Sequence, residues 1–314
     1  MLDAHTAFDA HRPALVAHCY RMLGSPVDAE DAVQEALIRA LRGASGFEER
    51  ASVRTWLHRI ATNVCLDELK RRKRRRELPT AQPAGEPDDP IAFTAAEEWL
   101  EPFPDAWALG PATTPEEALA IRQSLRLAFV AALQHLPAKQ RAALLLTQVA
   151  GMSAEEAAET LDTTKASIHS ALQRARSTLA HAEAPSGPLD AQHEQAVARY
   201  VAAFEAWDVD ALVHTLTDDI AFCMPPIPLW LDAPDKVYRF LHGPGSGCVG
   251  SRLVPVQACG QTAFAQYKAD GSAWGLVLLD TRQGKVSGIA TFLATEHLFP
   301  LFDLPLQLDA SPVV

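Results

Sequence analysis

The spacing of apolar residues predicts helices in the first part of the chain. Residues 15–23 are apolar on one face, and the Gly-Ser-Pro sequence at 24–26 ends that helix. The next helix is expected over residues 28–41 with Asp28 as its N-cap, and its apolar stripe lies opposite a row of acidic and amide side chains. A third helix, with Trp56 on its buried face, is expected over residues 52–72. It runs into the basic residues 70–76, which suit phosphate contacts or a solvated charged end.

Residues 153–179 carry the most informative pattern. Ser153 and Glu156 have the spacing of a capping box, in which each side chain binds the other residue's backbone N–H. A turn is expected at residues 161–163, and a second helix begins near Thr164. Its apolar residues follow a 4-3-4 spacing that gives one stripe, formed by Ile168, Leu172, Ala175 and Leu179. The polar, basic face of this helix suits a helix-turn-helix in the major groove, although an ordinary helical hairpin fits the same pattern.

The pattern changes to strands beyond a Pro-Ser-Gly-Pro boundary at residues 185–188. Two amphipathic helices come first, over residues 190–207 and 210–216. Strand-like runs follow, with Asp-Gly and Gln-Gly turns between some of them, at residues 220–224, 253–258, 262–267, 273–280 and 286–293. A short helix is expected at residues 233–241. Helices followed by a curved antiparallel meander predict an α+β cone.

Residues 77–115 are expected to be a linker. The segment is acidic and contains no Lys or Arg, and its repeated prolines argue against a long helix. A disordered spacer is the alternative for residues 77–96. Residues 97–107 differ, because their large apolar side chains are costly to leave in water and are expected to dock on another part of the protein. These side chains are Trp99, Leu100, Phe103 and Trp107.

Charge is distributed unevenly along the 314 residues. The net charge is −11, yet residues 1–76 carry 14 Lys/Arg against 10 Asp/Glu, whereas residues 188–314 carry 7 against 14. This asymmetry predicts nucleic-acid contacts in some parts of the chain only. No apolar run is long enough to span a membrane, and the N-terminus lacks a signal-peptide pattern. The five cysteines have no CxxC spacing, so we expect buried thiols in a reducing cytoplasm, with no metal site and no cofactor.

Three blocks of the sequence resemble an extracytoplasmic-function (ECF) RNA polymerase sigma factor of the sigma-70 superfamily. DAEDAVQEALIRAL at 28–41 and RTWLHRIATNVCLDELKRRKR at 54–74 resemble region 2, and residues 136–179 resemble region 4. The resemblance implies a multidomain chain with two all-α sigma domains. These are a region 2 helical bundle at residues 8–76 and a region 4 helix-turn-helix at residues 116–182.

The resemblance also implies partners and contact residues. Core RNA polymerase would be bound at its clamp helices and flap, and an acidic helix face would meet the clamp helices. That face comprises Asp28, Glu30, Asp31, Gln34 and Glu35. The minus-ten promoter element would be held by a loop with Phe47 and Arg50, which suits a flipped base, and by a helix face. That helix face comprises Arg54, Arg59, Asn63, Lys70 and Arg71.

The minus-thirty-five element would be contacted from the second helix of the helix-turn-helix. Its candidate residues are Thr164, Lys165, Ser167, His169, Arg174 and Arg176. Among them, Lys165 and His169 are expected at base edges, and both arginines at phosphates. Lys139 and Arg141, on the preceding helix, are further candidates for phosphate contacts.

The C-terminal part, residues 188–310, resembles the SnoaL-like domain appended to a subset of these sigma factors. WLEPFPD at 99–105 resembles the linker signature of that subset, which contacts the appended domain. The resemblance implies regulation by docking of this domain on the sigma core, with a small ligand in the cone as an additional option. The pocket would be lined by Phe222, Met224, Trp230, Tyr238, Trp274 and His297.

Alternative functions remain open at this stage. The sequence favours a promoter-specificity sigma factor without an active site, which initiates transcription with core RNA polymerase. A SnoaL-like enzyme of the isomerase or hydratase type, fused to a DNA-binding module, would need an acid and a base in the cone, where the strands offer few ionisable groups. An ordinary helix-turn-helix repressor would bind duplex promoter DNA without polymerase.

Overall fold

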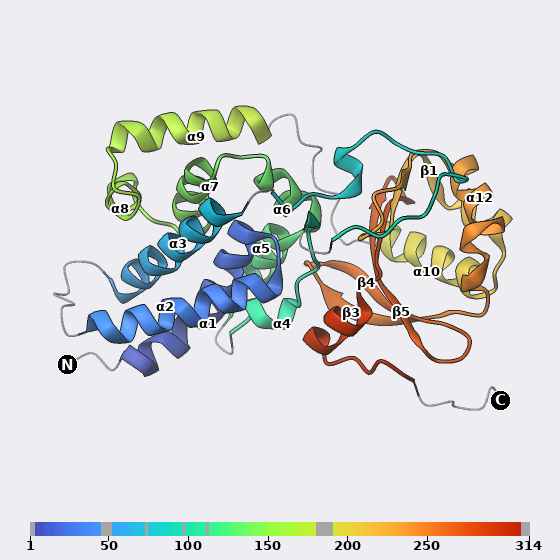
Figure 1. The fold of residues 1–314 in the computed structure, drawn as a ribbon, viewed down its shortest axis with the longest axis horizontal. Coiled ribbons are helices and arrows are strands. Elements are labelled where there is room, and N and C mark those ends of the chain that lie inside the picture. Colours follow the sequence, from blue (N-terminus) through green and yellow to red (C-terminus); the bar gives the residue numbers. More distant parts are fainter. Residues whose placement is uncertain are drawn as a thin grey trace. The chain divides into compact units, whose positions relative to one another are not determined.

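A computed structural model describes residues 4–44, 52–72, 75–95, 98–110, 113–179 and 191–308. The chain divides into two compact units (Figure 1). The N-terminal unit comprises Met1–Arg76 and Phe103–Ala184, and the C-terminal unit comprises Glu77–Pro102 and Pro185–Val314. The first part of the predicted linker therefore belongs to the C-terminal unit, and the remainder to the N-terminal unit.

Long helices begin the N-terminal unit and pack against one another: α1 (Ala4–Leu23), α2 (Pro26–Gly43) and α3 (Val53–Arg71). The N-cap of α2 is Ser25, whose hydroxyl accepts a 3.3 Å hydrogen bond from the backbone N–H of Asp28. The prediction of Asp28 as the N-cap was wrong by three residues. Pro26 extends the helix toward its N-terminus, because its fixed φ suits the first helical position.

The buried faces of α2 and α3 follow the predicted periodicity with two differences. On α2 the predicted alanine and valine stripe is buried, but Leu41 at its end is 48% exposed. On α3 the fully buried stripe runs through Leu57, Ala61 and Cys65, whereas Trp56 is only half-buried. Apolar residues occupy adjacent positions along α3, so the periodicity alone permits both stripes and the packing against α1 and α2 selects one.

Shorter helices complete the N-terminal unit: α4 (Asp105–Ala108), α5 (Pro115–Leu125), α6 (Leu127–Gln134), α7 (Ala138–Leu144) with the π-helical turn η4 (Leu145–Val149), α8 (Ala154–Thr160) and α9 (Lys165–Leu179). A break at Arg126 separates α5 from α6. The break shifts the phase of the buried stripe, which runs from Leu125 at the end of α5 to Leu127, Val130 and Leu133 on α6.

Arg141 ties α7 to the preceding turn and to the end of α1. Its side chain is 3% exposed, and its guanidinium donates to the carbonyl oxygen of Met22. It also donates to the side-chain oxygen of Gln134 at 2.6 Å, to the Gln134 carbonyl at 3.0 Å and to the Leu136 carbonyl at 3.2 Å. Burial lowers the pKa of Arg141 to about 10. The predicted phosphate contact of Arg141 was therefore wrong.

The C-terminal unit is built on a six-stranded sheet of order β2-β1-β6-β5-β4-β3 (Figure 1). The strands are β1 (Leu216–Cys223), β2 (Trp230–Leu231), β3 (Arg252–Ala258), β4 (Gln261–Tyr267), β5 (Ala273–Arg282) and β6 (Lys285–Phe292). β3 to β6 form the predicted antiparallel meander, and β1 pairs with β6 in parallel. The two-residue β2 was not predicted, because it is too short to show alternation.

Helices accompany this sheet: α10 (Ala191–Glu205), α11 (Val209–His214), α12 (Pro234–His242), α13 (Thr295–Leu298) and the 3₁₀ turns η5 (Pro244–Cys248) and η6 (Phe299–Phe302). α10 packs on β5 and β6, and α12 packs on β1. The predicted fold class, all-α sigma domains followed by an α+β domain, is confirmed. In the described ranges, every helix is too short or too polar to cross a lipid bilayer.

Residues 77–95 pack on the rest of the C-terminal unit, so this part of the linker is not the disordered spacer that the sequence left open. The segment contains one 3₁₀ turn, η2 (Pro79–Ala81). The backbone N–H of Gly85 donates to the Trp230 carbonyl at 2.9 Å, and that of Thr94 donates to the Pro226 carbonyl at 3.0 Å. The hydrogen-bond partners that order this segment are more than a hundred residues away in the sequence. The pattern of residues within the segment therefore could not predict its packing.

Candidate nucleic-acid interface

The predicted helix-turn-helix is present as α8 and α9. The capping box has both of its hydrogen bonds: the Ser153 N–H donates to the Glu156 carboxylate at 2.8 Å, and the Glu156 N–H donates to the Ser153 hydroxyl at 3.1 Å. Asp162 in the turn has a positive φ of 47°. Thr164 caps α9, because its hydroxyl accepts a 3.2 Å hydrogen bond from the Ser167 N–H. Local sequence signals therefore fix both ends of the turn.

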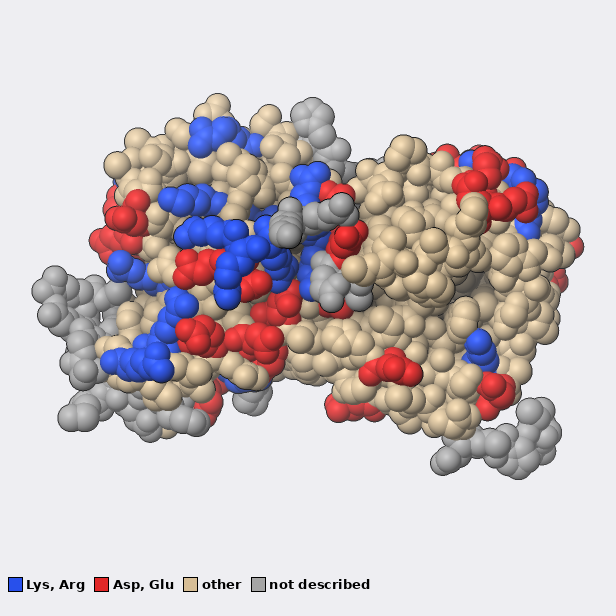
Figure 2. All heavy atoms as spheres, viewed as in Figure 1, with Lys and Arg blue, Asp and Glu red and all other residues tan. Residues whose placement is uncertain are grey.

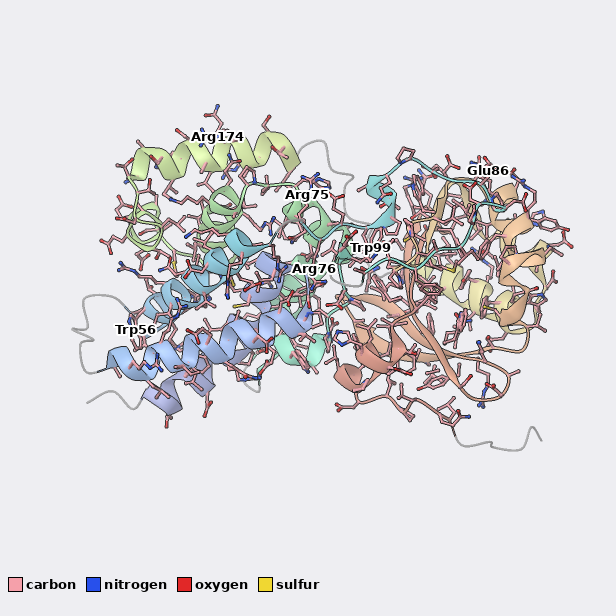
Figure 3. All side chains as sticks on the ribbon, viewed as in Figure 1. Trp56, Arg75, Arg76, Glu86, Trp99 and Arg174 are labelled. Carbon is pink, nitrogen blue, oxygen red and sulfur yellow. The ribbon has the colours of Figure 1, made fainter. Side chains whose placement is uncertain are left out.

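α9 presents a fully exposed polar surface. Ile168, Ala171, Leu172 and Ala175 are buried against the unit. The predicted contact residues Thr164, Lys165, Ser167, His169, Arg174 and Arg176 are all exposed. In Figure 3, Arg174 projects from α9 away from the neighbouring helices.

The exposed residues of α9 form rows along the helix. At 3.6 residues per turn, Lys165, His169 and Arg176 share one row, and Ser167 and Arg174 share another on the far side. The line directly opposite the buried stripe lies between these rows and carries Ala166, Ser170, Gln173 and Ser177. Sequence reasoning did not select Ser170 and Gln173 as contact residues, although their spacing of four and seven from Ala166 identifies this line.

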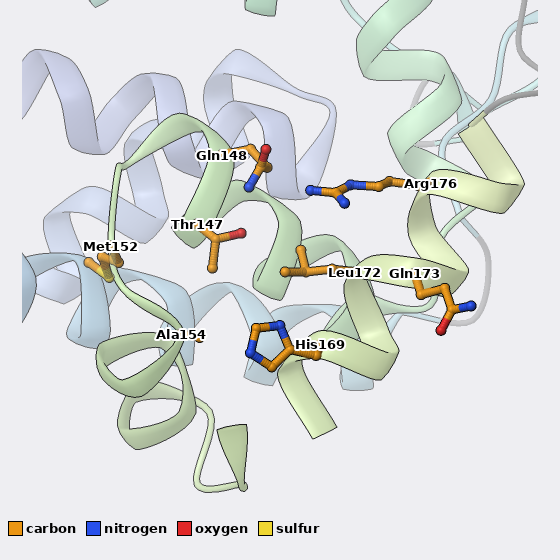
Figure 4. Close-up of a pocket in the computed structure, with 8 residues that line it drawn as sticks. All are labelled: Thr147, Gln148, Met152, Ala154, His169, Leu172, Gln173 and Arg176. Carbon is orange, nitrogen blue, oxygen red and sulfur yellow. The ribbon is translucent and has the colours of Figure 1, made fainter. Parts of the chain in front are cut away.

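His169 and Arg176 flank a hollow of about 410 Å³ beside α9 (Figure 4). Thr147 and Gln148 of the η4 turn line its other side. The Lys165 ammonium is paired with the Glu155 carboxylate of α8, which lowers the pKa of Glu155. The Lys165–His169–Arg176 row therefore adjoins α8 and the η4 turn.

The candidate minus-ten residues on α3 divide between two sides of the helix. Arg59, Asn63 and Lys70 share one row, with Arg59 and Lys70 exposed and Asn63 half-buried. Arg54 is exposed and lies one turn before the buried His58, at a hollow lined in part by α1. The predicted Phe47 and Arg50 lie outside the described residues.

The basic residues at the end of α3 have different surroundings. Lys70 pairs with Asp67 at 3.2 Å and Arg71 pairs with Glu68 at 2.7 Å, and both basic side chains are more than 70% exposed. Exposed pairs of this kind contribute little to stability, so both cations can exchange their partner for phosphate. Arg72 and Arg76 instead pair with Asp28 at the start of α2. Figure 2 shows Lys and Arg side chains gathered on one face of the N-terminal unit, with acidic side chains beside them.

Several acidic side chains on the predicted polymerase-binding face of α2 form ion pairs with arginines of the same unit. Asp28 is held by Arg72 and Arg76, Glu30 pairs with Arg12, and Glu35 pairs with Arg39 at 2.8 Å. Asp31 and Gln34 are exposed. Ile38 and Leu41, which continue this face, are 42% and 48% exposed, although the sequence suggested a buried position for Leu41. Exposed apolar residues beside acidic ones are typical of a partner surface.

The predicted docking motif is divided between the two units. In the C-terminal unit, the Trp99 indole N–H donates to the Thr94 hydroxyl at 2.7 Å, and the Leu100 N–H donates to the Glu77 carbonyl at 2.9 Å. In the N-terminal unit, the Phe103 ring lies 4.5 Å from the Tyr20 ring and 5.9 Å from the Trp107 ring. Trp99, Leu100 and Phe103 are buried and Trp107 is half-buried.

The C-terminal unit contains a cavity of about 270 Å³ between its sheet and helices α10 and α12. Phe222, Met224 and Trp274 line it as predicted. Trp230, Tyr238 and His297 were predicted wrongly, because each points elsewhere. The Trp230 indole donates to the Gln82 carbonyl at 2.8 Å, the Tyr238 ring packs on His242 at 4.3 Å, and His297 lies 3.2 Å from Glu101. Within the described ranges, no group of three or more His, Cys, Asp or Glu is placed to hold a metal.

Two family matches fall within the N-terminal unit. Residues 7–75 match the Sigma-70 region 2 family, and residues 126–179 match the family of Sigma-70, region 4. The chain is 42% identical over 318 residues to the ECF RNA polymerase sigma factor SigG of Mycobacterium tuberculosis (strain ATCC 25618 / H37Rv), covering 98% of this chain and 84% of SigG. It is 32% identical over 243 residues to SigJ of the same strain, covering 75% of this chain and 71% of SigJ.

Solved structures give the same result. The crystal structure of the Mycobacterium tuberculosis ECF sigma factor SigJ superposes with a TM-score of 0.63 at 25% identity, covering 96% of this chain and 100% of that chain. The similarity to SigG spans both units, and the region 2 and region 4 matches fall on the helices that carry the basic rows and the helix-turn-helix. The chain belongs to the ECF RNA polymerase sigma factors.

Proposed function

We propose that this chain directs core RNA polymerase to promoters, with α9 contacting the minus-thirty-five element and α3 the minus-ten element, and that the C-terminal unit regulates initiation by docking on the helical unit. The exposed surface of α9 carries this proposal. A capped helix with a polar line of Ser170 and Gln173 between the Lys165–His169–Arg176 row and the row that carries Arg174 suits base edges in the groove and phosphates on both sides.

The charge of the two units supports this division of roles. The N-terminal unit holds 21 Lys/Arg and 18 Asp/Glu, whereas the C-terminal unit holds 7 and 21. Phosphate neutralisation supplies most of the non-specific affinity for DNA, so the DNA contacts belong to the N-terminal unit. The C-terminal unit, at a net −14, repels DNA and is attracted to the basic surfaces that DNA would occupy.

Polymerase binding is assigned to the exposed part of α2. Asp31 and Gln34 supply polar contacts, and Ile38 and Leu41 supply apolar area on the same face. Asp28 and Glu30 are assigned to stabilising the N-terminal unit, because their carboxylates are already paired with Arg72, Arg76 and Arg12.

No reaction is assigned to the cavity of the C-terminal unit. An isomerase or hydratase needs an acid and a base within reach of its substrate. The described lining contains no carboxylate and no imidazole, and its ionisable side chains are Tyr200, Cys248 and Lys268. Burial raises the pKa of the Tyr200 phenol and of the Cys248 thiol, so neither is a base near neutral pH.

Run-off transcription with bacterial core polymerase tests the proposal. The template is the upstream region of the protein's own gene, and the full-length chain is compared with Gln173→Ala. A protease site inserted between Ala184 and Pro185 allows residues 185–314 to be cut from folded protein and separated from the remaining chain, which keeps Glu77–Pro102. We expect specific initiation by the full chain, a loss with Gln173→Ala, and a changed level after cleavage. Failure of the full chain both to bind core polymerase and to initiate would refute the sigma-factor activity.

A further inference from the structure

The cavity of the C-terminal unit is lined by residues of that unit alone. We propose that it binds a small, largely apolar molecule that carries a single anionic group, and that linker residues Ile91 and Phe93 form the lid over this molecule. The sequence suggested only that a small ligand could occupy this domain. The structure adds the chemistry of the ligand and the contribution of the linker to the site.

The size and lining of the cavity favour an apolar ligand. Its volume of about 270 Å³ corresponds to about nine water molecules at roughly 30 Å³ each, whereas packed interiors leave few voids larger than one water. Aromatic and aliphatic side chains from the helices and the sheet dominate the wall, including Phe204, Phe222, Phe240, Leu241 and Val277. Such a wall offers dispersion contacts to a molecule and little to bulk water.

A single positive charge sets the preference for an anion. Among the lining residues that the structure describes, Lys268 is the formally charged one. Its ammonium lies 3.9 Å from the centre of the Trp274 ring, and no carboxylate in the described ranges pairs with it. Asp270 lies nearby, but its carboxylate accepts hydrogen bonds from the Ser272 N–H at 2.9 Å and the Ser272 hydroxyl at 2.6 Å. An ammonium beside an apolar wall binds an anion more strongly than it would in water.

The linker completes the wall on the open side. Ile91 and Phe93 line the cavity, yet they are 43% and 67% exposed. The segment that carries them is anchored at both ends. Glu86, labelled in Figure 3, pairs with Lys236 and Arg239 of α12 at 2.9 Å each. At the other end, the Thr94 hydroxyl donates to the Pro226 carbonyl at 2.8 Å.

A ligand that contacts Ile91 and Phe93 would bury more of both side chains and so tie the linker to the C-terminal unit. The same chain continues into Phe103, which packs on Tyr20 in the N-terminal unit. Occupancy of the cavity would therefore change the freedom of the segment that joins the two units. This consequence for transcription rests on the proposed function, whereas binding itself does not.

A pair of fluorescent probes tests the site in the full-length protein. 1-Anilinonaphthalene-8-sulfonate carries one anionic group, and N-phenyl-1-naphthylamine has the same rings without it. We expect one saturable site, with the sulfonate bound more tightly than the neutral probe. Lys268→Met should weaken the sulfonate about tenfold, which is about 1.4 kcal/mol, and leave the neutral probe within about twofold. Lys285→Met, at the exposed start of β6, is the matched control and should change neither probe.

Two further variants test the cavity wall and the lid. Val277→Phe fills the cavity and should weaken both probes, and Phe93→Ser removes part of the lid and should do the same. Equal affinity for the two probes together with no effect of Lys268→Met would overturn the anion site. Absence of saturable one-to-one binding of either probe would overturn the cavity as a ligand site. Both outcomes are measured without polymerase, so a failure here is distinguishable from a failure in run-off transcription.

Discussion

Acidification should destabilise the N-terminal unit because of two buried histidines. His18 of α1 and His58 of α3 are each 2% exposed, and their rings lie 5.4 Å apart. His18 Nε2 lies 2.9 Å from the Thr62 hydroxyl, and His58 Nδ1 donates to the Arg54 carbonyl at 2.9 Å. Burial lowers the pKa of His58 to about 4 and that of His18 well below its usual value. The charges of Arg21 and Arg54 act in the same direction, so both imidazoles are neutral in the folded unit near pH 7.

The size of the effect follows from the two states of His58. Its pKa is about 4 in the folded unit and about 6.5 in the unfolded chain, so the unfolded chain takes up the proton first as the pH falls. Stability is unaffected above pH 6.5 and is lost progressively between pH 6.5 and pH 4. At pH 5 the loss from His58 alone is about 2 kcal/mol relative to pH 8. Protonation of His18 adds to this loss of stability. The combined loss is a large share of a typical domain stability of about 5–15 kcal/mol.

Hydrogen-exchange mass spectrometry of the full-length protein at pH 8 and pH 5 measures this loss for α1 and α3 separately from the C-terminal unit. Rates are corrected for intrinsic exchange, and the opening free energies of the slowest amides are compared. His58→Gln is the control, because it removes the titrating group and should reduce the pH dependence by about 2 kcal/mol. Equal opening free energies at both pH values in the unmodified chain would refute the reasoning.

Further predictions concern the helical unit and its charge. Arg141→Met removes the bonds to three backbone carbonyls and should lower the free energy of unfolding by about 3–5 kcal/mol, so an unchanged guanidinium midpoint would contradict the role of Arg141. Arg174→Ala should weaken promoter binding by the holoenzyme and reduce the salt slope by about one, whereas Arg199→Ala in the C-terminal unit should leave both unchanged in anisotropy titrations. Proteolytic removal of residues 185–314, which hold 7 Lys/Arg and 14 Asp/Glu, should raise DNA affinity at low salt and less so at high salt; salt-independent affinity would exclude an electrostatic cause.

Local signals account for the parts of the structure that the sequence predicted well. The capping box at Ser153 and the 4-3-4 stripe lie within one helical pair, so the pattern contains all the information needed to place α8 and α9. The meander strands are bounded by turns with positive φ at Gly271 and Gly284, which the Asp-Gly and Gln-Gly sequences indicate. In both cases the determining residues are close neighbours in the chain.

Contacts between distant segments account for the parts that were missed. Arg141 follows Lys139 in a sequence typical of a solvent-exposed helix, and only the Met22 and Leu136 carbonyls explain its burial. Ile91 and Phe93 lie in a proline-rich segment without periodicity, and they line the cavity because Pro226 and α12 anchor their neighbours. The sequence placed Tyr238 in the cavity, but α12 turns Val237, Phe240 and Leu241 inward and Tyr238 outward.

The N-terminal unit must open for the proposed promoter contacts to form together. The Thr55 hydroxyl of α3 donates to the Glu156 carboxylate of α8 at 3.1 Å, so the two parts proposed to contact DNA touch each other. Elements centred near minus ten and minus thirty-five are about 85 Å apart along B-DNA at 3.4 Å per base pair. A compact unit of this size has a radius of gyration of about 15 Å and cannot span that distance.

A reversible cross-link tests this requirement. The substitutions Thr55→Cys and Glu156→Cys introduce two thiols that a short cleavable bismaleimide can join. Cys248→Ser removes the native thiol that is partly exposed, and the other four native cysteines are buried. The cross-linked chain should lose run-off transcription and regain it when the linker is cleaved, because region 4 cannot leave α3 while joined to it. The same variant without the reagent controls for the substitutions. Full activity of the cross-linked chain would mean that α3 and α8 stay together on the promoter, and that α3 or α9 does not contact its assigned element.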